Sequence, residues 1–296
     1  MLNEQNLKGI FVPVVTPFLA NEQLDINSYR NYVSSLFVHD IQGLVVNGTT
    51  GESPTVTWEE VAELVSVTKD LMAEKGRRLP IVVGTGTNST ASTVQRTELA
   101  GHLGADAVLV VVPYYSRPSQ EGILEHFRRV SQVGVPVIAY EIPARTGVRL
   151  TIETTRRILD LDGVIGLKDS SGQIGFSSEL TRLSAKPILC GEDLYFHAML
   201  SQGASGGMLA SANVHTRSLI NVYQLFNTGS VTAAKQAFDL LVPCIQSLFQ
   251  ESNPAPLKWL LARQGLIATD TLRSPMSPIS EGLKLTLEQW LPSLSN

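Results

Sequence analysis

The chain has 296 residues, of which 43% are hydrophobic and 17% charged, and its formal net charge is −4. That length suits one large α/β barrel or two smaller domains, and the composition is that of an ordinary globular protein. A slightly acidic chain without a Lys/Arg-rich run has no electrostatic footprint for nucleic acid, which excludes nucleic-acid binding as its main function.

No segment has the character of a targeting or membrane sequence. Residues Met1–Gln5 lack the basic and apolar regions of a signal peptide, and the longest apolar run, Ala107–Pro113, is too short to cross a bilayer. Cys190 and Cys244 have no spacing typical of a disulfide framework or a metal site. We therefore expect a reduced, cytoplasmic protein with no membrane partner.

Short apolar segments alternate along the chain with longer amphipathic ones, which is the pattern of βα units. The predicted strands are almost entirely apolar, as expected where a parallel sheet is covered on both faces. In chain order they are Ile10–Val15, Gly43–Asn47, Pro80–Gly84, Ala107–Val112, Val137–Glu141, Val164–Lys168, Pro187–Gly191 and Gly206–Ala210. Predicted helices between them include Trp58–Leu71, Ser89–Leu103, Ser119–Val133 and Tyr195–Gln202. Thr57 and Glu60 resemble a capping box at the first of these helices.

About eight such units predict a (β/α)8 TIM barrel, with a doubly wound parallel sheet as the competing architecture. Beyond residue 228 the strand signals end, and three helices are predicted near Val231–Phe249, Pro254–Gln264 and Ser280–Leu291. No low-complexity linker precedes them. We therefore predict a barrel of residues 1–228 and a C-terminal helical extension, residues 229–296, packed on it.

Two short motifs match known signatures in the wrong context. Residues 84–89 follow a predicted strand, yet they lack the third glycine of a dinucleotide fingerprint and lie in the third βα unit rather than the first. Residues 203–207 match the G-x-S-x-G nucleophile elbow, but they lie between a helix and a strand, the reverse of the required order. We interpret the first as an ordinary βα loop and reject a serine hydrolase.

The five histidines show neither i, i+4 pairing nor an H-E-x-x-H pattern, so we predict no metal site. They are His39, His102, His126, His197 and His215.

The chemistry of a barrel enzyme comes from the carboxyl ends of its strands and the loops that follow. Lys168 closes an otherwise apolar strand, where its charged form is poorly solvated, and a neutral amine can form a Schiff base with a ketone. Tyr140 ends the neighbouring strand, and its phenol is suited to moving protons during imine formation. The alternatives are a solvent-reaching lysine or one paired with Asp169, and a core tyrosine.

The loop after the second strand, Gly48-Thr49-Thr50-Gly51, combines flexible glycines with two hydroxyl groups just before a helix. Backbone N–H groups at such a turn favour a small anion such as the carboxylate of a keto acid. The alternative is an ordinary glycine-rich turn. Arg145 is placed to clamp a second carboxylate through two hydrogen bonds, or is a surface charge.

The chain resembles the dihydrodipicolinate synthase/N-acetylneuraminate lyase family of class I aldolases from about Gly9 to Pro292. The candidate residues named above lie in the segments that carry this resemblance. The most specific segments are Gly48–Ser53, Val112–Tyr115, Tyr140–Gly147 and Gly166–Asp169. The resemblance implies that Lys168 forms an imine with pyruvate without any metal or organic cofactor. It also implies a proton relay of Tyr140, Thr50 and Tyr115, with Tyr115 acting across a subunit contact in a homotetramer built from dimers.

The resemblance further assigns substrate-binding positions. Thr49 and Thr50 would hold the pyruvate carboxylate, and the backbones of Gly191 and Met208 would line the site. Arg145 would receive the carboxylate of L-aspartate 4-semialdehyde, which favours a synthase over a neuraminate lyase. The expected reaction is therefore the condensation of pyruvate with that aldehyde, and the expected partners are small molecules.

Several departures from the family's usual sequence leave two alternative functions open. Glu141, Met208 and the segment Lys168-Asp169-Ser170-Ser171 differ from the residues that are usual in the family at these positions. A related pyruvate-dependent aldolase or dehydratase acting on a 2-keto-3-deoxy sugar acid or a sialic acid is one alternative. A catalytically silent keto-acid-binding paralogue is the other.

A last implication of the resemblance concerns regulation. Trp58, Val61 and Ser92 stand where lysine-inhibited members carry two histidines and a glutamate, which bind the charged ends of the inhibitor. We therefore expect weak or absent inhibition by lysine.

Overall fold

The computed structural model of the chain describes residues 1–183 and 186–294. Its eight strands form a closed barrel in chain order, with the paired strands running parallel. The bounds are β1 (Gly9–Pro13), β2 (Gly43–Val46), β3 (Ile81–Gly84), β4 (Ala107–Val111), β5 (Val137–Glu141), β6 (Val164–Asp169), β7 (Ile188–Cys190) and β8 (Gly206–Met208). The predicted (β/α)8 barrel is confirmed, and the open doubly wound sheet is wrong.

The bounds of β5 are as predicted, and the bounds of the other strands differ from the predicted ones by at most two residues, for local reasons. β2 ends at Val46 because Asn47 takes a positive φ of 60° and leaves the extended conformation. β8 ends at Met208 because Ala210 begins a 3-10 turn, Ala210–Asn213. Every residue of β5 and β6 is buried, including the polar side chains at the carboxyl ends of these otherwise apolar strands.

The chain forms two compact units, each made of two separate segments. The first contains residues 1–9 and 80–208, and the second contains residues 10–79 and 209–296, of which 295–296 lie outside the described residues. This division differs from the predicted boundary at residues 228 and 229, which stays a prediction.

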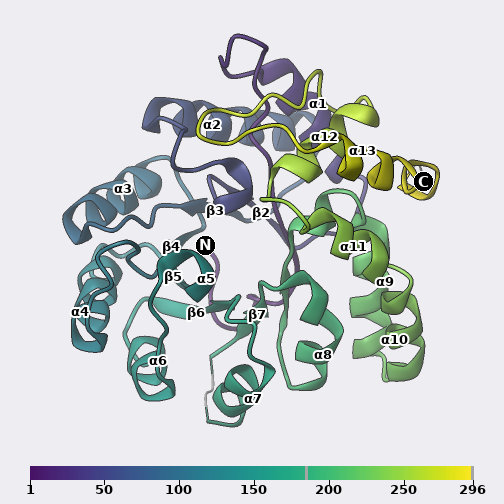
Figure 1. Cartoon of the computed structure of the whole chain (residues 1–296). Helices are drawn as coiled ribbons and strands as arrows, with labels where there is room; N and C mark the ends of the chain where they lie inside the picture. Colours follow the sequence, from purple (N-terminus) through teal and green to yellow (C-terminus); the bar gives the residue numbers. More distant parts are fainter. Residues whose placement is uncertain (184–185, 295–296) are drawn as a thin grey trace. The chain divides into compact units, whose positions relative to one another are not determined.

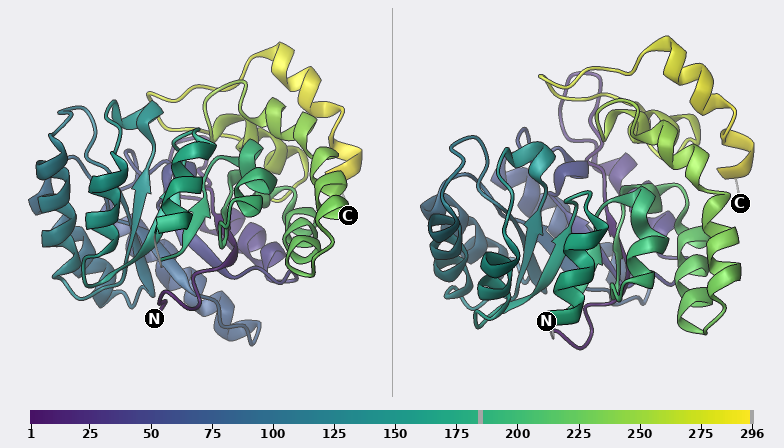
Figure 2. Two further views of the ribbon diagram at one scale, coloured as in Figure 1. Left: turned by 90° about the horizontal axis from the view of Figure 1, so that it is seen from below. Right: turned by 60° about the horizontal axis from the view of Figure 1, so that its bottom comes forward.

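In the first unit, strands β3 to β8 pair in sequence order. The helices of this unit are α3 (Thr90–His102), α4 (Gln120–Ser131), α5 (Pro143–Thr146), α6 (Ile152–Leu159), α7 (Ile174–Leu183) and α8 (Phe196–Ser201). Figure 1 shows α4, α6 and α7 in an arc outside strands β4 to β7, and Figure 2 shows these helices running alongside the strands. Ser89 and Ser119 cap α3 and α4 at the positions expected from the sequence.

The second unit contains β1 beyond Gly9, β2 and the remaining helices. These are α1 (Ile26–Leu36), α2 (Trp58–Glu74), α9 (Thr216–Asn227), α10 (Val231–Asp239), α11 (Val242–Leu248), α12 (Ala255–Arg263), α13 (Glu281–Glu288) and α14 (Leu291–Leu294). The capping box of α2 is confirmed, since Thr57 and Glu60 each accept a hydrogen bond from the backbone of the other. Among the described residues, the C-terminal extension is helical as predicted.

One predicted helix is wrong in extent. The segment Val231–Phe249 forms two helices, α10 and α11, rather than one. Pro243 lies in the first turn of α11 and lacks the N–H group that a continuous helix would bond to the carbonyl of Asp239.

Candidate active site

Lys168 and Tyr140 are brought together by the register of strands β5 and β6. They are direct partners in this parallel pair, so their side chains leave the same face of the sheet. The side chains are 6% and 5% exposed, and Lys168 Nζ lies 4.3 Å from the centroid of the Tyr140 ring. The Lys168 amine is therefore held against the aromatic ring of Tyr140 at the carboxyl ends of adjacent strands. An amine and a phenol are groups that imine chemistry uses as nucleophile and proton carrier.

Gly191 forms a wall of this site, immediately after β7. A Cβ atom on Gly191 would lie 2.7 Å from Lys168 Cε and 2.9 Å from Lys168 Cγ, and it would also collide with Ser170 Oγ. Its N–H donates to the carbonyl of Asp169 at 2.8 Å, which fixes this close approach. Only glycine leaves room for the observed position of the Lys168 side chain.

Ser170 was not identified from the sequence as a site residue. Its side chain is 5% exposed, and its hydroxyl oxygen has no hydrogen-bond partner among the described residues. The only sequence feature that pointed to Ser170 was its position two residues after Lys168. It belongs to the segment Lys168-Asp169-Ser170-Ser171, which differs from the usual sequence of the family. The hydroxyl lies against Gly191 and therefore borders the same site as the amine.

Two buried carboxyl groups lie on the opposite face of the same strand pair. Glu141 and Asp169 are partners in the β5–β6 register and are 0% and 2% exposed. Burial, the largest influence, and the charge of Asp169 raise the pKa of Glu141, whereas the Leu150 N–H and Arg149 lower it, and the net pKa is about 7. Burial also raises the pKa of Asp169, although Ser177 and Ser171 donate hydrogen bonds that favour its charged form.

Three further predicted residues of the first unit differ in exposure. Met208 ends β8 and is fully buried, whereas Arg145 lies on the exposed surface of α5. Tyr115 is 90% exposed and has a φ of 70°, a left-handed conformation that is unfavourable for an aromatic residue. The chain itself thus holds Tyr115 outward, in a fixed and strained backbone geometry.

Thr49 and Thr50 lie in the second unit, in a 3-10 turn, Thr49–Gly51, directly after β2. Gly51 N–H donates to the carbonyl of Gly48 at 3.0 Å, which closes the predicted tight turn. Thr50 is 4% exposed, and its hydroxyl accepts a hydrogen bond from Asn253 Nδ2 at 3.1 Å. Thr16 Oγ1 donates to the carbonyl of Gly51 at 2.7 Å. The hydroxyl-bearing turn is therefore held by side chains on both sides.

A buried ion pair supports this turn, and we did not predict it from the sequence. Glu52, which ends the turn at a φ of 56°, pairs with Lys258 of α12. The second oxygen of Glu52 accepts a hydrogen bond from Arg273 N at 3.1 Å. The one sequence feature that could have indicated this ion pair was a single lysine within the apolar segment Pro256–Leu261.

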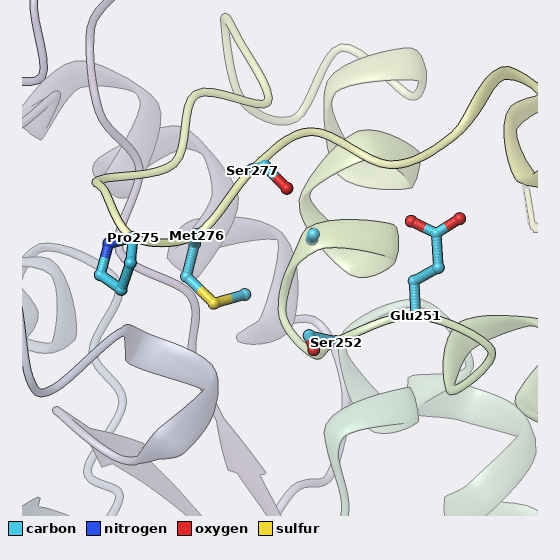
Figure 3. Close-up of a pocket in the computed structure, with 6 residues that line it drawn as sticks. Glu251, Ser252, Pro275, Met276 and Ser277 are labelled. Carbon is cyan, nitrogen blue, oxygen red and sulfur yellow. The ribbon is translucent and has the colours of Figure 1, made fainter.

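The structure also contains a pocket of about 320 Å³ in the second unit, and none of the predicted site residues lines it (Figure 3). It is lined by Glu251, Ser252, Ala255, Pro275, Met276 and Ser277. The Glu251 carboxylate already accepts hydrogen bonds from the N–H and hydroxyl of Ser280, the N-cap of α13. Its charge is thus engaged by the residue that begins helix α13.

Two findings concern metals and membranes. Among residues 1–183 and 186–294, no group of three or more His, Cys, Asp or Glu side chains is arranged to hold a metal ion. Within the same ranges, no helix combines the length and the apolar character needed to span a bilayer.

Comparison with known proteins places this geometry in a family. Residues 6–293 match the model of the dihydrodipicolinate synthetase family. Two curated relatives are the 4-hydroxy-tetrahydrodipicolinate synthase of Herminiimonas arsenicoxydans, 38% identical over 93% of this chain and 94% of its own, and synthase 2 of Clostridium acetobutylicum, 34% identical over 96% and 99%.

Solved structures agree. The dihydrodipicolinate synthase of Thermotoga maritima superposes with a TM-score of 0.92 at 34% identity, covering 97% of this chain and 98% of that one. The enzyme of Cyanidioschyzon merolae, determined with lysine bound, has a TM-score of 0.93 at 28% identity, with 98% of each chain covered. With a full-length family match, close relatives and a shared barrel, this chain belongs to the dihydrodipicolinate synthetase family.

Proposed function

We propose that this protein is a class I lyase that condenses pyruvate with L-aspartate 4-semialdehyde through an imine on Lys168. The observation that carries the proposal is the position of the Lys168 amine 4.3 Å from the Tyr140 ring centroid, at the ends of adjacent strands. Family membership supports it, as does the activity named for the relatives.

In the proposed reaction, the Lys168 amine attacks the keto carbon of pyruvate, and water leaves to give an imine. Loss of a methyl proton converts the imine to an enamine, whose carbon attacks the aldehyde. The amino group of the aldehyde substrate then attacks the imine carbon, which closes the ring and releases Lys168. Tyr140 is placed to carry protons to and from the carbinolamine, and the steps need no metal or organic cofactor.

The turn after β2 is proposed as the binding site for the pyruvate carboxylate, through Thr49 and Thr50. In a parallel barrel the loops that follow the strands share one rim, so residues from different strands serve one site. Thr50 would also join the proton relay. The backbones of Gly191 and Met208 would line the pyruvate site, in agreement with the close contact of Gly191 with Lys168.

Arg145 is proposed to bind the carboxylate of the aldehyde substrate through paired hydrogen bonds. Its exposure on α5 is consistent with a group that meets the second substrate at the mouth of the barrel.

Tyr115 is proposed to complete the relay of a neighbouring subunit. A tyrosine that is 90% exposed in a left-handed conformation is costly in an isolated chain, and a partner would cover it. We therefore propose a homotetramer built from dimers, acting in the cytoplasm on small-molecule substrates.

Borohydride trapping and a coupled assay test the proposal. With pyruvate and borohydride, mass spectrometry should show a reduced adduct on Lys168, and K168A should show neither adduct nor turnover. With aspartate semialdehyde, the purified protein should give steady turnover.

Other outcomes identify the alternatives. Trapping without turnover on aspartate semialdehyde indicates a related aldolase acting on a 2-keto-3-deoxy sugar acid or a sialic acid. If pyruvate leaves Lys168 unmodified, the imine mechanism is wrong and a silent keto-acid-binding protein remains.

A further inference from the structure

The region around helix α12 contacts the turn after β2 at two points. Asn253, two residues before the helix begins, donates from Nδ2 to Thr50 Oγ1 at 3.1 Å. Lys258, within the helix, donates from Nζ to Glu52 Oε1 at 2.7 Å. The Lys258 contact holds the residue at which the turn ends, whereas the Asn253 contact acts on a side chain that carries a hydroxyl group.

The hydrogen bond from Asn253 determines where the Thr50 hydroxyl proton can point. A hydroxyl group has one proton to donate and two lone pairs that accept. Asn253 Nδ2 occupies a lone pair, so the proton must point away from Asn253. Thr50 is 4% exposed, and within residues 1–183 and 186–294 no protein group accepts its hydroxyl proton. A buried donor in this state is stabilised by a ligand that brings an acceptor.

The backbone of the turn has supports that do not involve Asn253. Thr16 Oγ1 donates to the carbonyl of Gly51 at 2.7 Å. The N–H of Gly51 donates to the carbonyl of Gly48 at 3.0 Å, and Glu52 is paired with Lys258. The contact of Asn253 with Thr50 therefore directs a hydroxyl group within a turn that other residues hold in place.

We propose that Asn253 is a positioning residue that directs the Thr50 hydroxyl proton toward the carboxylate of pyruvate. The amide N–H donates to the hydroxyl oxygen, and the hydroxyl donates to the carboxylate. In such a chain each hydrogen bond polarises the next, and the bond to the charged acceptor is the stronger one. This inference rests on the pyruvate-binding role proposed above for Thr50.

Borohydride trapping over a range of pyruvate concentrations tests the inference. N253A should raise the half-saturating pyruvate concentration by about tenfold, the effect of weakening one hydrogen bond to a charged group. The trapping rate at saturating pyruvate and the KM for aspartate semialdehyde should stay close to the wild-type values. A general loosening of the site would instead lower the saturated rate as well.

N253D reverses the direction of the hydrogen bond while keeping the size of the side chain. Its carboxylate can only accept, so it turns the Thr50 proton toward residue 253, and its charge repels the carboxylate of pyruvate. N253D should therefore require more pyruvate for half-saturation than N253A does.

A double-mutant cycle separates the direction of the hydroxyl from a packing effect. T50A should itself raise the half-saturating pyruvate concentration, and N253A added to T50A should raise it no further, because the hydroxyl group is gone. In T50S, which keeps a hydroxyl, N253A should have its full effect. N31A is the matched control, because Asn31 Nδ2 donates to the carbonyl of Leu266 at 2.9 Å, beyond the far end of α12. N31A should leave the pyruvate dependence unchanged.

Three results overturn the inference. The first is an N253A protein with the wild-type dependence on pyruvate. The second is an equal loss from N253A with and without T50A, which means that Asn253 acts through packing. The third is an N253D protein that binds pyruvate at least as well as N253A, which means that the amide does not act as a donor. If the wild type forms no adduct with pyruvate at any concentration, the proposed function fails together with the inference. Wild-type trapping that is insensitive to N253A leaves the proposed function standing and rejects the inference alone.

Discussion

Lys258 and Glu52 form an ion pair that is enclosed within the second unit, with Nζ and Oε1 2.7 Å apart and the side chains 0% and 2% exposed. Lys258 also donates to the carbonyl of Thr16 at 2.9 Å and lies 4.3 Å from the ring centroid of Phe18. Burial lowers the pKa of Lys258, and Glu52 opposes that change. The pair joins residues 206 positions apart in the sequence and supports the end of the turn that bears Thr49 and Thr50.

We predict that K258M destabilises the protein by about 3–5 kcal/mol, because it leaves the buried Glu52 carboxylate without its counter-ion. The double variant K258M/E52Q should cost less than K258M alone. R263M is the matched control from the same helix. Arg263 pairs with Glu288 at the surface, where an ion pair contributes about 1 kcal/mol or less. Urea unfolding of the four proteins gives the comparison, and equal losses in K258M and R263M would contradict it.

We predict that G191A loses at least about tenfold in the rate of borohydride trapping with pyruvate. The new methyl group would occupy space now taken by Lys168 Cε and Cγ, so the amine must move, and overpacking costs about 1–3 kcal/mol. G175A is the control, because a Cβ at Gly175 in α7 meets nothing within 4 Å. A G191A protein that traps pyruvate at the wild-type rate would show that Lys168 has room to relocate.

We predict that E141Q is more stable than the wild type at neutral pH. The folded protein keeps the Glu141 proton up to about pH 7, while the unfolded chain releases it near the ordinary value of 4.5. The wild-type free energy of unfolding therefore falls as pH rises between about 4.5 and about 7. Above that range E141Q should exceed it by up to about 3 kcal/mol, and the difference should vanish toward pH 4.5.

Chemical denaturation at three pH values measures this difference. E98Q, which removes an exposed carboxyl group of α3, should show no such pH-dependent gain. An E141Q stability that follows the wild type at every pH would mean that Glu141 ionises freely in the folded protein.

We predict little inhibition by lysine. The expected lysine-binding positions hold Trp58, Val61 and Ser92, and Val61 is completely buried in α2. None of the three side chains carries a charge to pair with the ammonium or carboxylate of lysine. Initial rates over a range of lysine concentrations measure the effect, and a sub-millimolar inhibition constant would refute the prediction.

The sequence was most informative where local pattern decides structure. The apolar runs located all eight strands, and the proximity of Tyr140 and Lys168 followed from their places at the ends of consecutive strands. Thr57 and Glu60 could be identified because a capping box is a contact over three residues.

Contacts between residues far apart in the sequence, and the burial of individual side chains, could not be predicted from local sequence patterns. Nothing near Lys258 indicates a partner 206 residues away, and a lysine in a helix usually faces solvent. Glu141 was noted only as a departure from a pattern, because its burial depends on how the segment up to Leu150 folds back over it. The break at Pro243 was visible in the sequence, and its missing N–H should have divided the predicted helix.

The second unit joins the early segment, residues 10–79, to the late segment, residues 209–296, and this has a consequence for biosynthesis. At about 5–20 residues per second, a ribosome needs about 10–40 s to travel the 206 positions from Glu52 to Lys258. Throughout that interval the Glu52 carboxylate lacks its counter-ion, so the nascent turn with Thr49 and Thr50 cannot reach its final geometry. Stalling or premature release of the ribosome before Lys258 emerges would thus yield chains that lack an assembled pyruvate-binding turn, however well residues 80–208 have folded.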